Sequence, residues 1–171
     1  RLNDGMGAYV VTQLVKAMLK KRIQVEDAKV LILGLSFKEN CPDIRNTKVI
    51  EIYKELLDLG SEVDVYDPWV KKEEAKKEFQ IDLIGEVKQN YYDAILICVK
   101  HEIFKDLDIS YLTSDKNYII VGFSAIHSDA NKNNCKSIQN EIVSDISKMF
   151  SVRVIKETLT HPIDKSGKSK V

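Results

Sequence analysis

The stretch that decides the fold reads Val30-Leu31-Ile32-Leu33-Gly34-Leu35-Ser36-Phe37-Lys38-Glu39-Asn40-Cys41-Pro42-Asp43-Ile44-Arg45-Asn46-Thr47. Its four leading apolar residues are typical of a strand buried on both faces, as in a parallel sheet. Gly34 then lets the backbone turn sharply, and a charged loop leads to a helix predicted from about Thr47. Strand, charged loop and helix amino terminus form the arrangement in which open α/β sheets bind phosphorylated ligands. From spacing alone, a plain crossover with solvated charges explains the stretch equally well.

The rest of the chain alternates strands and helices. Strands are predicted at 62–66, 81–84, 94–99 and 118–121, and helices at 6–19, 47–60, 71–79 and 107–112. This alternation predicts an α/β fold, a doubly wound Rossmann-like parallel sheet preceded by a long connecting helix. The helix at 71–79 is charged, and we expect it to lie on the surface with Trp69, Ala75 and Phe79 turned inward.

Two polar residues follow predicted strands. Asp67 stands where an acid holds a ribose hydroxyl in the dinucleotide fold. The glycine triplet of that fold is absent, because residues 34–39 read Gly-Leu-Ser-Phe-Lys-Glu, so we favour a turn or cap role for Asp67 over ribose contact. His101 is predicted on the rim where ligands bind, and a capping or packing role is favoured over ligand contact.

Apolar residues occupy two adjoining faces of the predicted helix at 6–19. Such a helix packs against more than one partner. It fits a domain connector, a subunit interface or the outer helix of this domain, and periodicity does not separate the three.

Charge and cysteine content argue against several classes of protein. Lys+Arg and Asp+Glu are both 26, so no basic excess indicates a nucleic-acid or anionic-membrane partner. No apolar run has membrane-spanning length. Cys41, Cys98 and Cys135 are far apart, which is typical of reduced thiols in a cytoplasmic protein. Cys98 lies in an apolar run and is expected to be a core residue, not a nucleophile.

Four motifs, taken in order, resemble those of the UDP-glucose/UDP-N-acetylhexosamine 6-dehydrogenase family. They are Asn3-Asp4-Gly5-Met6, the loop 34–47, Tyr66-Asp67-Pro68-Trp69-Val70 and His101-Glu102-Ile103-Phe104. The resemblance covers residues 1 to about 121, and the form of the loop is closest to the UDP-N-acetylhexosamine enzymes of polysaccharide biosynthesis. Members of this family use NAD to oxidise the C6 alcohol of a UDP-sugar to a carboxylate.

The resemblance implies a division of the chain and a set of site residues. Residues 1–25 would be the central connecting and dimerisation helix, 26–127 the UDP-sugar-binding domain and 128–171 a divergent carboxyl-terminal tail. Phe37 and Lys38 would contact the UDP-sugar. Arg45 would reach the pyrophosphate of NAD, the implied cofactor, held by another domain. The expected assembly is a homodimer through the central helix.

The resemblance therefore implies the substrate-binding half of an NAD-dependent nucleotide-sugar 6-dehydrogenase. The family's cysteine nucleophile and NAD domain lie upstream of the central helix and do not match any residue here, so we expect the chain alone to be inactive. Where the family carries an aspartate and then a basic residue, this chain reads Gly122-Phe123-Ser124. The alternative is a catalytically inactive UDP-sugar-binding and dimerisation module.

Overall fold

The computed structural model describes residues 6–107, 112–113 and 119–122. Its elements in chain order are α1 (Met6–Lys20), β1 (Lys29–Leu33), α2 (Val49–Asp58), β2 (Glu62–Tyr66), α3 (Lys72–Phe79), β3 (Ala94–Ile97), the short 3-10 helix η1 (Glu102–Asp106) and β4 (Ile119–Gly122). The expectations for the tail 128–171, for Phe123 and Ser124 and for Cys135 fall outside the described residues.

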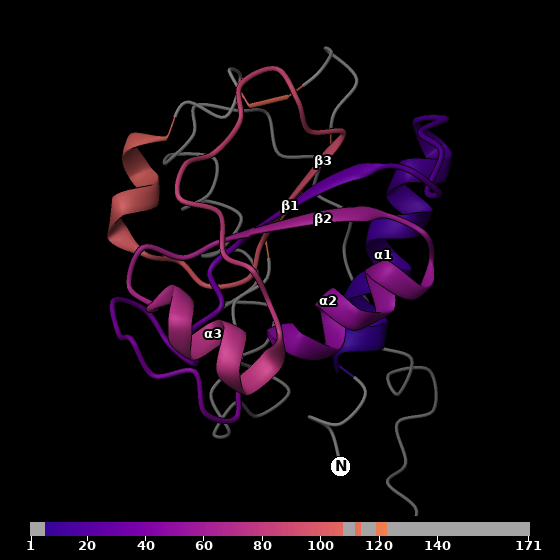
Figure 1. Cartoon of the computed structure of the whole chain (residues 1–171). Coiled ribbons are helices and arrows are strands. Elements are labelled where there is room, and N and C mark those ends of the chain that lie inside the picture. The colour runs from indigo at the N-terminus through magenta and orange to yellow at the C-terminus, as the bar shows by residue number, and fades with distance from the viewer. Residues whose placement is uncertain (1–5, 108–111, 114–118, 123–171) are drawn as a thin grey trace, which may run out of the picture.

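The four strands form one parallel sheet in the order β2-β1-β3-β4 (Figure 1). In this register Ile32 of β1 lies between Val65 of β2 and Leu96 of β3. The predicted α/β fold with a Rossmann-like parallel sheet is thereby confirmed. Because β2 and β3 flank β1 on opposite sides, the chain changes direction across the sheet between β1 and β3. In open α/β sheets, ligands bind at the carboxyl ends of the strands beside such a switch point.

Each face of the sheet is buried. Val30 and Ile32 belong to the core on the side of α1 and α2, whereas Leu31 and Leu33 pack with Phe104 on the opposite side. Since successive side chains of a strand point to opposite faces, a strand buried on both faces needs an apolar residue at every position. This requirement accounts for the apolar run of β1 that opens the deciding stretch.

Helix α1 packs against α2 beside the sheet (Figure 1). Its apolar residues Val10, Val11, Leu14 and Met18 are all buried within this chain. The two helices approach closely at Gly7, where an added Cβ would lie 2.7 Å from the Cβ of Glu51. Of the three roles left open for this helix, packing as an outer helix of the fold is the one that the structure shows. A role in dimerisation stays a prediction.

Several local expectations need correction. Helix α2 begins at Val49, and Thr47 precedes it, its hydroxyl accepting a hydrogen bond from the Val49 N–H at 3.3 Å. Trp69 is expected to turn inward, but it stays 44% exposed, with the indole stacked on the buried imidazole of His101. Most of the short helix expected at 107–112 lies outside the described residues, while Leu107 itself has extended backbone and follows the helical turn η1. The strand expected at 81–84 is a single bridge between Val65 and Leu83.

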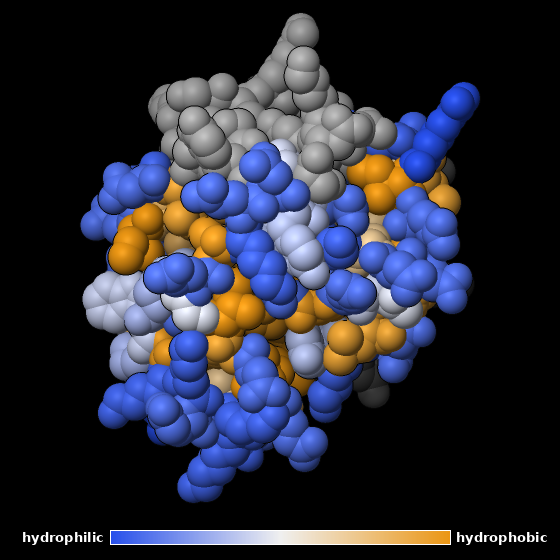
Figure 2. All heavy atoms as spheres, turned by 45° about the horizontal axis from the view of Figure 1, so that its top comes forward, coloured by the Kyte–Doolittle hydropathy of each residue, from blue (hydrophilic) through white to orange (hydrophobic). Residues whose placement is uncertain are grey.

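The surface is mixed in character. Figure 2 shows apolar residues between hydrophilic side chains on one face of the molecule. Among the described residues, none of the helices is both long and apolar enough to cross a membrane.

Candidate functional site

The carboxyl ends of β1, β2 and β3 are tied together by the carboxylate of Asp67, which is 4% exposed. Its Oδ2 accepts hydrogen bonds from the backbone N–H groups of Leu35 at 2.7 Å and Ser36 at 2.9 Å. Its Oδ1 accepts one from the N–H of Trp69 at 2.9 Å. Asp67 is thus a turn residue, as the sequence favoured, and it also anchors the start of the loop that follows β1.

His101 joins the same network from the end of β3. Its imidazole is fully buried, with Nε2 lying 3.1 Å from both Asp67 Oδ2 and Ser36 Oγ. Its Nδ1 accepts a hydrogen bond from the backbone N–H of Asn40 at 2.9 Å. Burial alone would raise the pKa of Asp67, but the hydrogen bonds from His101, Leu35 and Ser36 outweigh it and lower that pKa. The packing role favoured for His101 is what the structure shows.

The segment 36–43 forms a closed loop, which we call the clasped loop. Its ends meet because the N–H of Phe37 donates to the carbonyl of Asp43 at 2.7 Å. Inside it, Ser36 Oγ donates to the Lys38 carbonyl at 3.1 Å. Asn40 has the left-handed backbone angle φ 52°, and its Oδ1 accepts the N–H of Glu102 at 3.0 Å.

The three site residues implied by the resemblance lie at the surface of this region. Phe37 and Lys38 are exposed on the clasped loop, Phe37 with 51% of its surface accessible. Arg45 lies just beyond the loop, its side chain 84% exposed. The guanidinium donates through Nε and Nη2 to the two carboxylate oxygens of Asp43 at 2.9 and 2.8 Å. This pairing, helped by the charge of Lys38, lowers the pKa of Asp43 to about 2.

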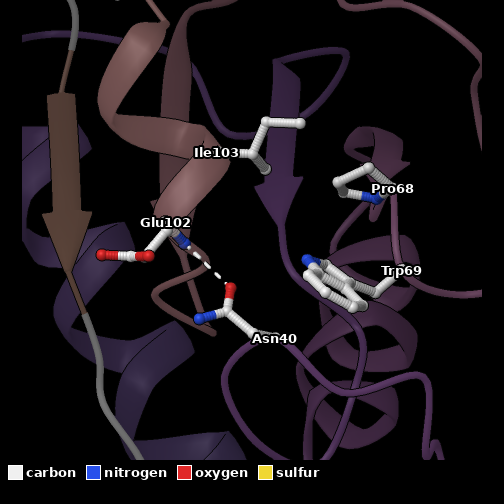
Figure 3. Close-up of a pocket in the computed structure, with 5 residues that line it drawn as sticks. All are labelled: Asn40, Pro68, Trp69, Glu102 and Ile103. Carbon is white, nitrogen blue, oxygen red and sulfur yellow. Dashed lines mark hydrogen bonds between the residues drawn. The ribbon is translucent and has the colours of Figure 1, made fainter.

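An open pocket of about 500 Å³ lies beside the clasped loop, lined by Asn40, Pro68, Trp69, Glu102 and Ile103 (Figure 3). Trp69 and Pro68 flank one side, and Glu102 and Ile103 the other. The pattern of the sequence does not predict this pocket. A usable signal is present, because Trp69 and Ile103 are large apolar residues in the segments that follow the carboxyl ends of β2 and β3, Trp69 shortly after β2 and Ile103 within η1.

The two described cysteines differ in burial. Cys98 is buried at the end of β3, and burial raises the pKa of its thiol far above the usual range, so the expectation that it is a core residue is confirmed. Cys41 is half-buried. Over residues 6–107, 112–113 and 119–122, no group of three or more His, Cys, Asp or Glu side chains could hold a metal ion.

The sequence of this chain is similar to those of known nucleotide-sugar dehydrogenases. Residues 31–128 match the model of the UDP-glucose/GDP-mannose dehydrogenase family, UDP binding domain. A UDP-N-acetyl-D-glucosamine 6-dehydrogenase of Pseudomonas aeruginosa is 57% identical over 107 residues, which cover 63% of this chain and 25% of that protein. One from Salmonella typhi is 52% identical over 122 residues, covering 70% of this chain and 29% of the relative.

A solved structure agrees in fold. The UDP-D-ManNAc dehydrogenase from Pyrococcus horikoshii superposes with a TM-score of 0.59 at 27% identity, covering 77% of this chain and 30% of that one. The chain therefore spans between a quarter and a third of the length of these relatives. The clasped loop, Asp67 and His101 all fall inside the matched family domain.

Proposed function

Because the chain belongs to the UDP-glucose/GDP-mannose dehydrogenase family through its UDP binding domain, we propose that it is the substrate-binding half of an NAD-dependent nucleotide-sugar 6-dehydrogenase. The substrate we propose is a UDP-N-acetylhexosamine, oxidised at C6 to a uronate that feeds polysaccharide biosynthesis. The observation that carries this proposal is the clasped loop, a segment of the family domain that presents Phe37 and Lys38 to solvent at the switch point of the sheet.

Each proposed contact matches the chemistry of its residue. The ammonium of Lys38 is a compact charge with three donors, which suits a phosphate or a group of sugar hydroxyls. The exposed ring of Phe37 offers an apolar face for the sugar or the base. Both side chains project from a loop whose backbone is already hydrogen-bonded, so a ligand meets groups that need little ordering.

Arg45 is proposed to contact the pyrophosphate of NAD held by another domain. Its pairing with Asp43 uses Nε and Nη2, and a guanidinium has five N–H donors. The remaining donors are therefore able to reach a phosphate while the ion pair with Asp43 fixes the plane of the group. A planar guanidinium suits bidentate phosphate contact better than an ammonium does.

The wider assembly is proposed on the same basis. Residues 1–25 would serve as the central connecting helix, 26–127 as the UDP-sugar-binding domain and 128–171 as a divergent tail, in a cytoplasmic homodimer. The buried residues of α1 are already used within the chain, so a partner subunit would meet its other face, where Leu19 is 64% exposed.

Calorimetric titration tests the proposed binding function. UDP, UDP-GlcNAc and UDP-GalNAc are titrated, up to millimolar concentration, into the wild-type chain, Lys38→Ala and Lys77→Ala, an exposed lysine of α3 that serves as the charge-matched control. We expect Lys38→Ala to weaken binding by about tenfold, the effect of losing one charge-assisted hydrogen bond, and Lys77→Ala to bind as the wild type does. Equal affinity of the two variants would remove Lys38 from the site, and absence of binding by the wild type would contradict the proposal as a whole.

A further inference from the structure

His101 is hydrogen-bonded through both ring nitrogens, and its partners fix where the ring proton lies. A backbone N–H can only donate, so Nδ1, which faces the Asn40 N–H at 2.9 Å, must be the unprotonated acceptor. In a neutral imidazole the proton then belongs to Nε2. Geometry alone thus assigns a neutral ring in the Nε2–H form.

The surroundings of Nε2 agree with this assignment. Asp67 Oδ2, at 3.1 Å, is a carboxylate oxygen and accepts. Ser36 Oγ, also at 3.1 Å, directs its own hydrogen to the Lys38 carbonyl and therefore accepts from the imidazole. The Nε2–H of His101 is therefore shared between Ser36, which follows β1, and Asp67, which follows β2. Within this network every polar atom has a partner, in keeping with the finding that the described residues include no unsatisfied buried side-chain polar atom.

Asn40 connects the imidazole to the far end of the clasped loop. Its N–H donates to His101 Nδ1, while its Oδ1 accepts the N–H of Glu102, the residue next to His101. In the first bond the loop donates, and in the second bond the segment after β3 donates. Together they hold Asn40 in a left-handed backbone conformation, which asparagine tolerates better than most residues. The apex of the loop is consequently pinned to the segment that follows β3.

We propose that His101 is a positioning residue of the nucleotide-sugar site, which holds the clasped loop, and with it Phe37 and Lys38, in the form that binds ligand. The inference rests on the proposed function, because it assigns no contact between His101 and substrate. The imidazole is fully buried and acts through the Asn40 N–H and Ser36. Without the Nδ1 acceptor the loop would sample other conformations, and ligand binding would then carry the entropic cost of ordering it.

Two substitutions distinguish the role of Nδ1 as an acceptor from the role of Nε2 as a donor. In His101→Asn the amide oxygen stands as many bonds from Cα as Nδ1 does, so an acceptor for the Asn40 N–H is retained and the donor to Asp67 is lost. In His101→Gln the amide nitrogen stands as many bonds from Cα as Nε2 does, so a donor to Asp67 is retained and the acceptor for Asn40 is lost. Both variants lose ring volume, and their unfolding free energies are measured so that affinity can be compared at known stability.

The experiment measures amide hydrogen exchange at Asn40 and the affinity for UDP-GlcNAc in the wild type, both His101 variants and Lys38→Ala. We expect the Asn40 amide to be protected in the wild type and in His101→Asn but not in His101→Gln. We also expect His101→Gln to bind about fivefold more weakly than His101→Asn, the effect of one lost hydrogen bond. Nitrogen-15 spectra of the wild-type ring should report a protonated Nε2 and an unprotonated Nδ1.

The results distinguish failure of this inference from failure of the proposed function. If Lys38→Ala weakens binding but His101→Gln and His101→Asn bind equally, His101 does not position the loop. A protonated Nδ1 in the wild type, or an unprotected Asn40 amide, overturns the inference without any ligand. If the wild type does not bind UDP-GlcNAc, the proposed function and the inference that rests on it both fail.

Discussion

At the scale of single residues, the position of Gly34 places two requirements on its residue that only glycine satisfies. Its φ of 88° lies in the left-handed region, where a side chain is strained. An added Cβ would also lie 2.5 Å from the Cβ of Val99 and 2.8 Å from its backbone nitrogen. Gly34 therefore allows the end of β1 to approach the end of β3, and the loop that begins at Leu35 depends on that approach.

Replacing Gly34 by alanine should destabilise the fold by about 3 kcal/mol or more, because backbone strain and steric overlap act together. Urea unfolding measures the loss. Gly85→Ala is the matched control, since its φ is not positive and its nearest neighbour is the flexible end of the Lys72 side chain at 3.0 Å. We expect that control to stay within about 0.5 kcal/mol of the wild type. Similar losses for the two variants would show that Gly34 is not uniquely required.

The local role of Asp67 as a turn residue is predictable from the sequence, but its long-range hydrogen bonds are not. The position of an acid before Pro68 indicated a turn residue, and its Oδ1 does accept the N–H of Trp69. Its other partners, Leu35, Ser36 and His101, are more than 30 positions away in sequence. Local patterns carry no information on which distant backbone groups a carboxylate will meet. The buried network was therefore beyond prediction from the residues alone.

At the scale of elements, the crossing of α1 over α2 depends on a small residue. Alanine ordinarily stabilises a helix by about 1 kcal/mol relative to glycine. At Gly7 the added Cβ would lie 2.7 Å from the Cβ of Glu51, an atom that cannot move without its backbone. The overlap should therefore outweigh the gain in helix propensity.

We expect Gly7→Ala to destabilise the protein by about 1–2 kcal/mol, as overpacking of a close contact does. Urea unfolding followed by circular dichroism measures it. Thr12→Ala, on the exposed side of the same helix, is the control and should be neutral or slightly stabilising. A stabilised Gly7→Ala variant would mean that the two helices are free to separate at this point.

Elements with strong apolar patterns were predicted well, and short ones were not. β1 and β3 are buried at nearly every position, so uninterrupted apolar runs identified both. The turn η1 has only five residues, too few for a helical period to appear, so the sequence pattern does not predict it. Trp69, expected to turn inward, stacks its indole beside the buried imidazole of His101 at a centroid distance of 6.4 Å and remains partly exposed.

At the scale of the whole molecule, stability should depend on the charge of Asp67. Hydrogen bonds lower its pKa in the folded state below the ordinary value of 3.8, despite the opposing effect of burial. A carboxyl group of this kind stabilises the fold fully above its unfolded pKa, and the contribution is lost as the pH falls through the folded pKa. We expect the unfolding free energy to fall as the pH is lowered below about 4.

The variant Asp67→Asn separates this group from the other carboxylates. At pH 7 it should be less stable than the wild type by about 3 kcal/mol, because an amide cannot accept from all the backbone donors around it. Its stability should also change less with acid, as judged by urea midpoints between pH 7 and pH 3. An acid dependence as steep as that of the wild type would show that other groups control the pH response.

The ties from Asp67 and His101 to the backbone of Leu35, Ser36 and Asn40 have a consequence for how such a protein diverges. They are made to main-chain N–H groups, which every residue except proline supplies, whereas Phe37 and Lys38 are exposed and hold no part of the buried core. If Phe37 and Lys38 contact the ligand as proposed, mutations at these two exposed positions would alter ligand preference and leave folding nearly unchanged. Under the proposed function, the side chains that would meet the ligand are therefore distinct from the buried groups that fix the backbone of the loop, and that separation would make the loop an evolvable part of the molecule.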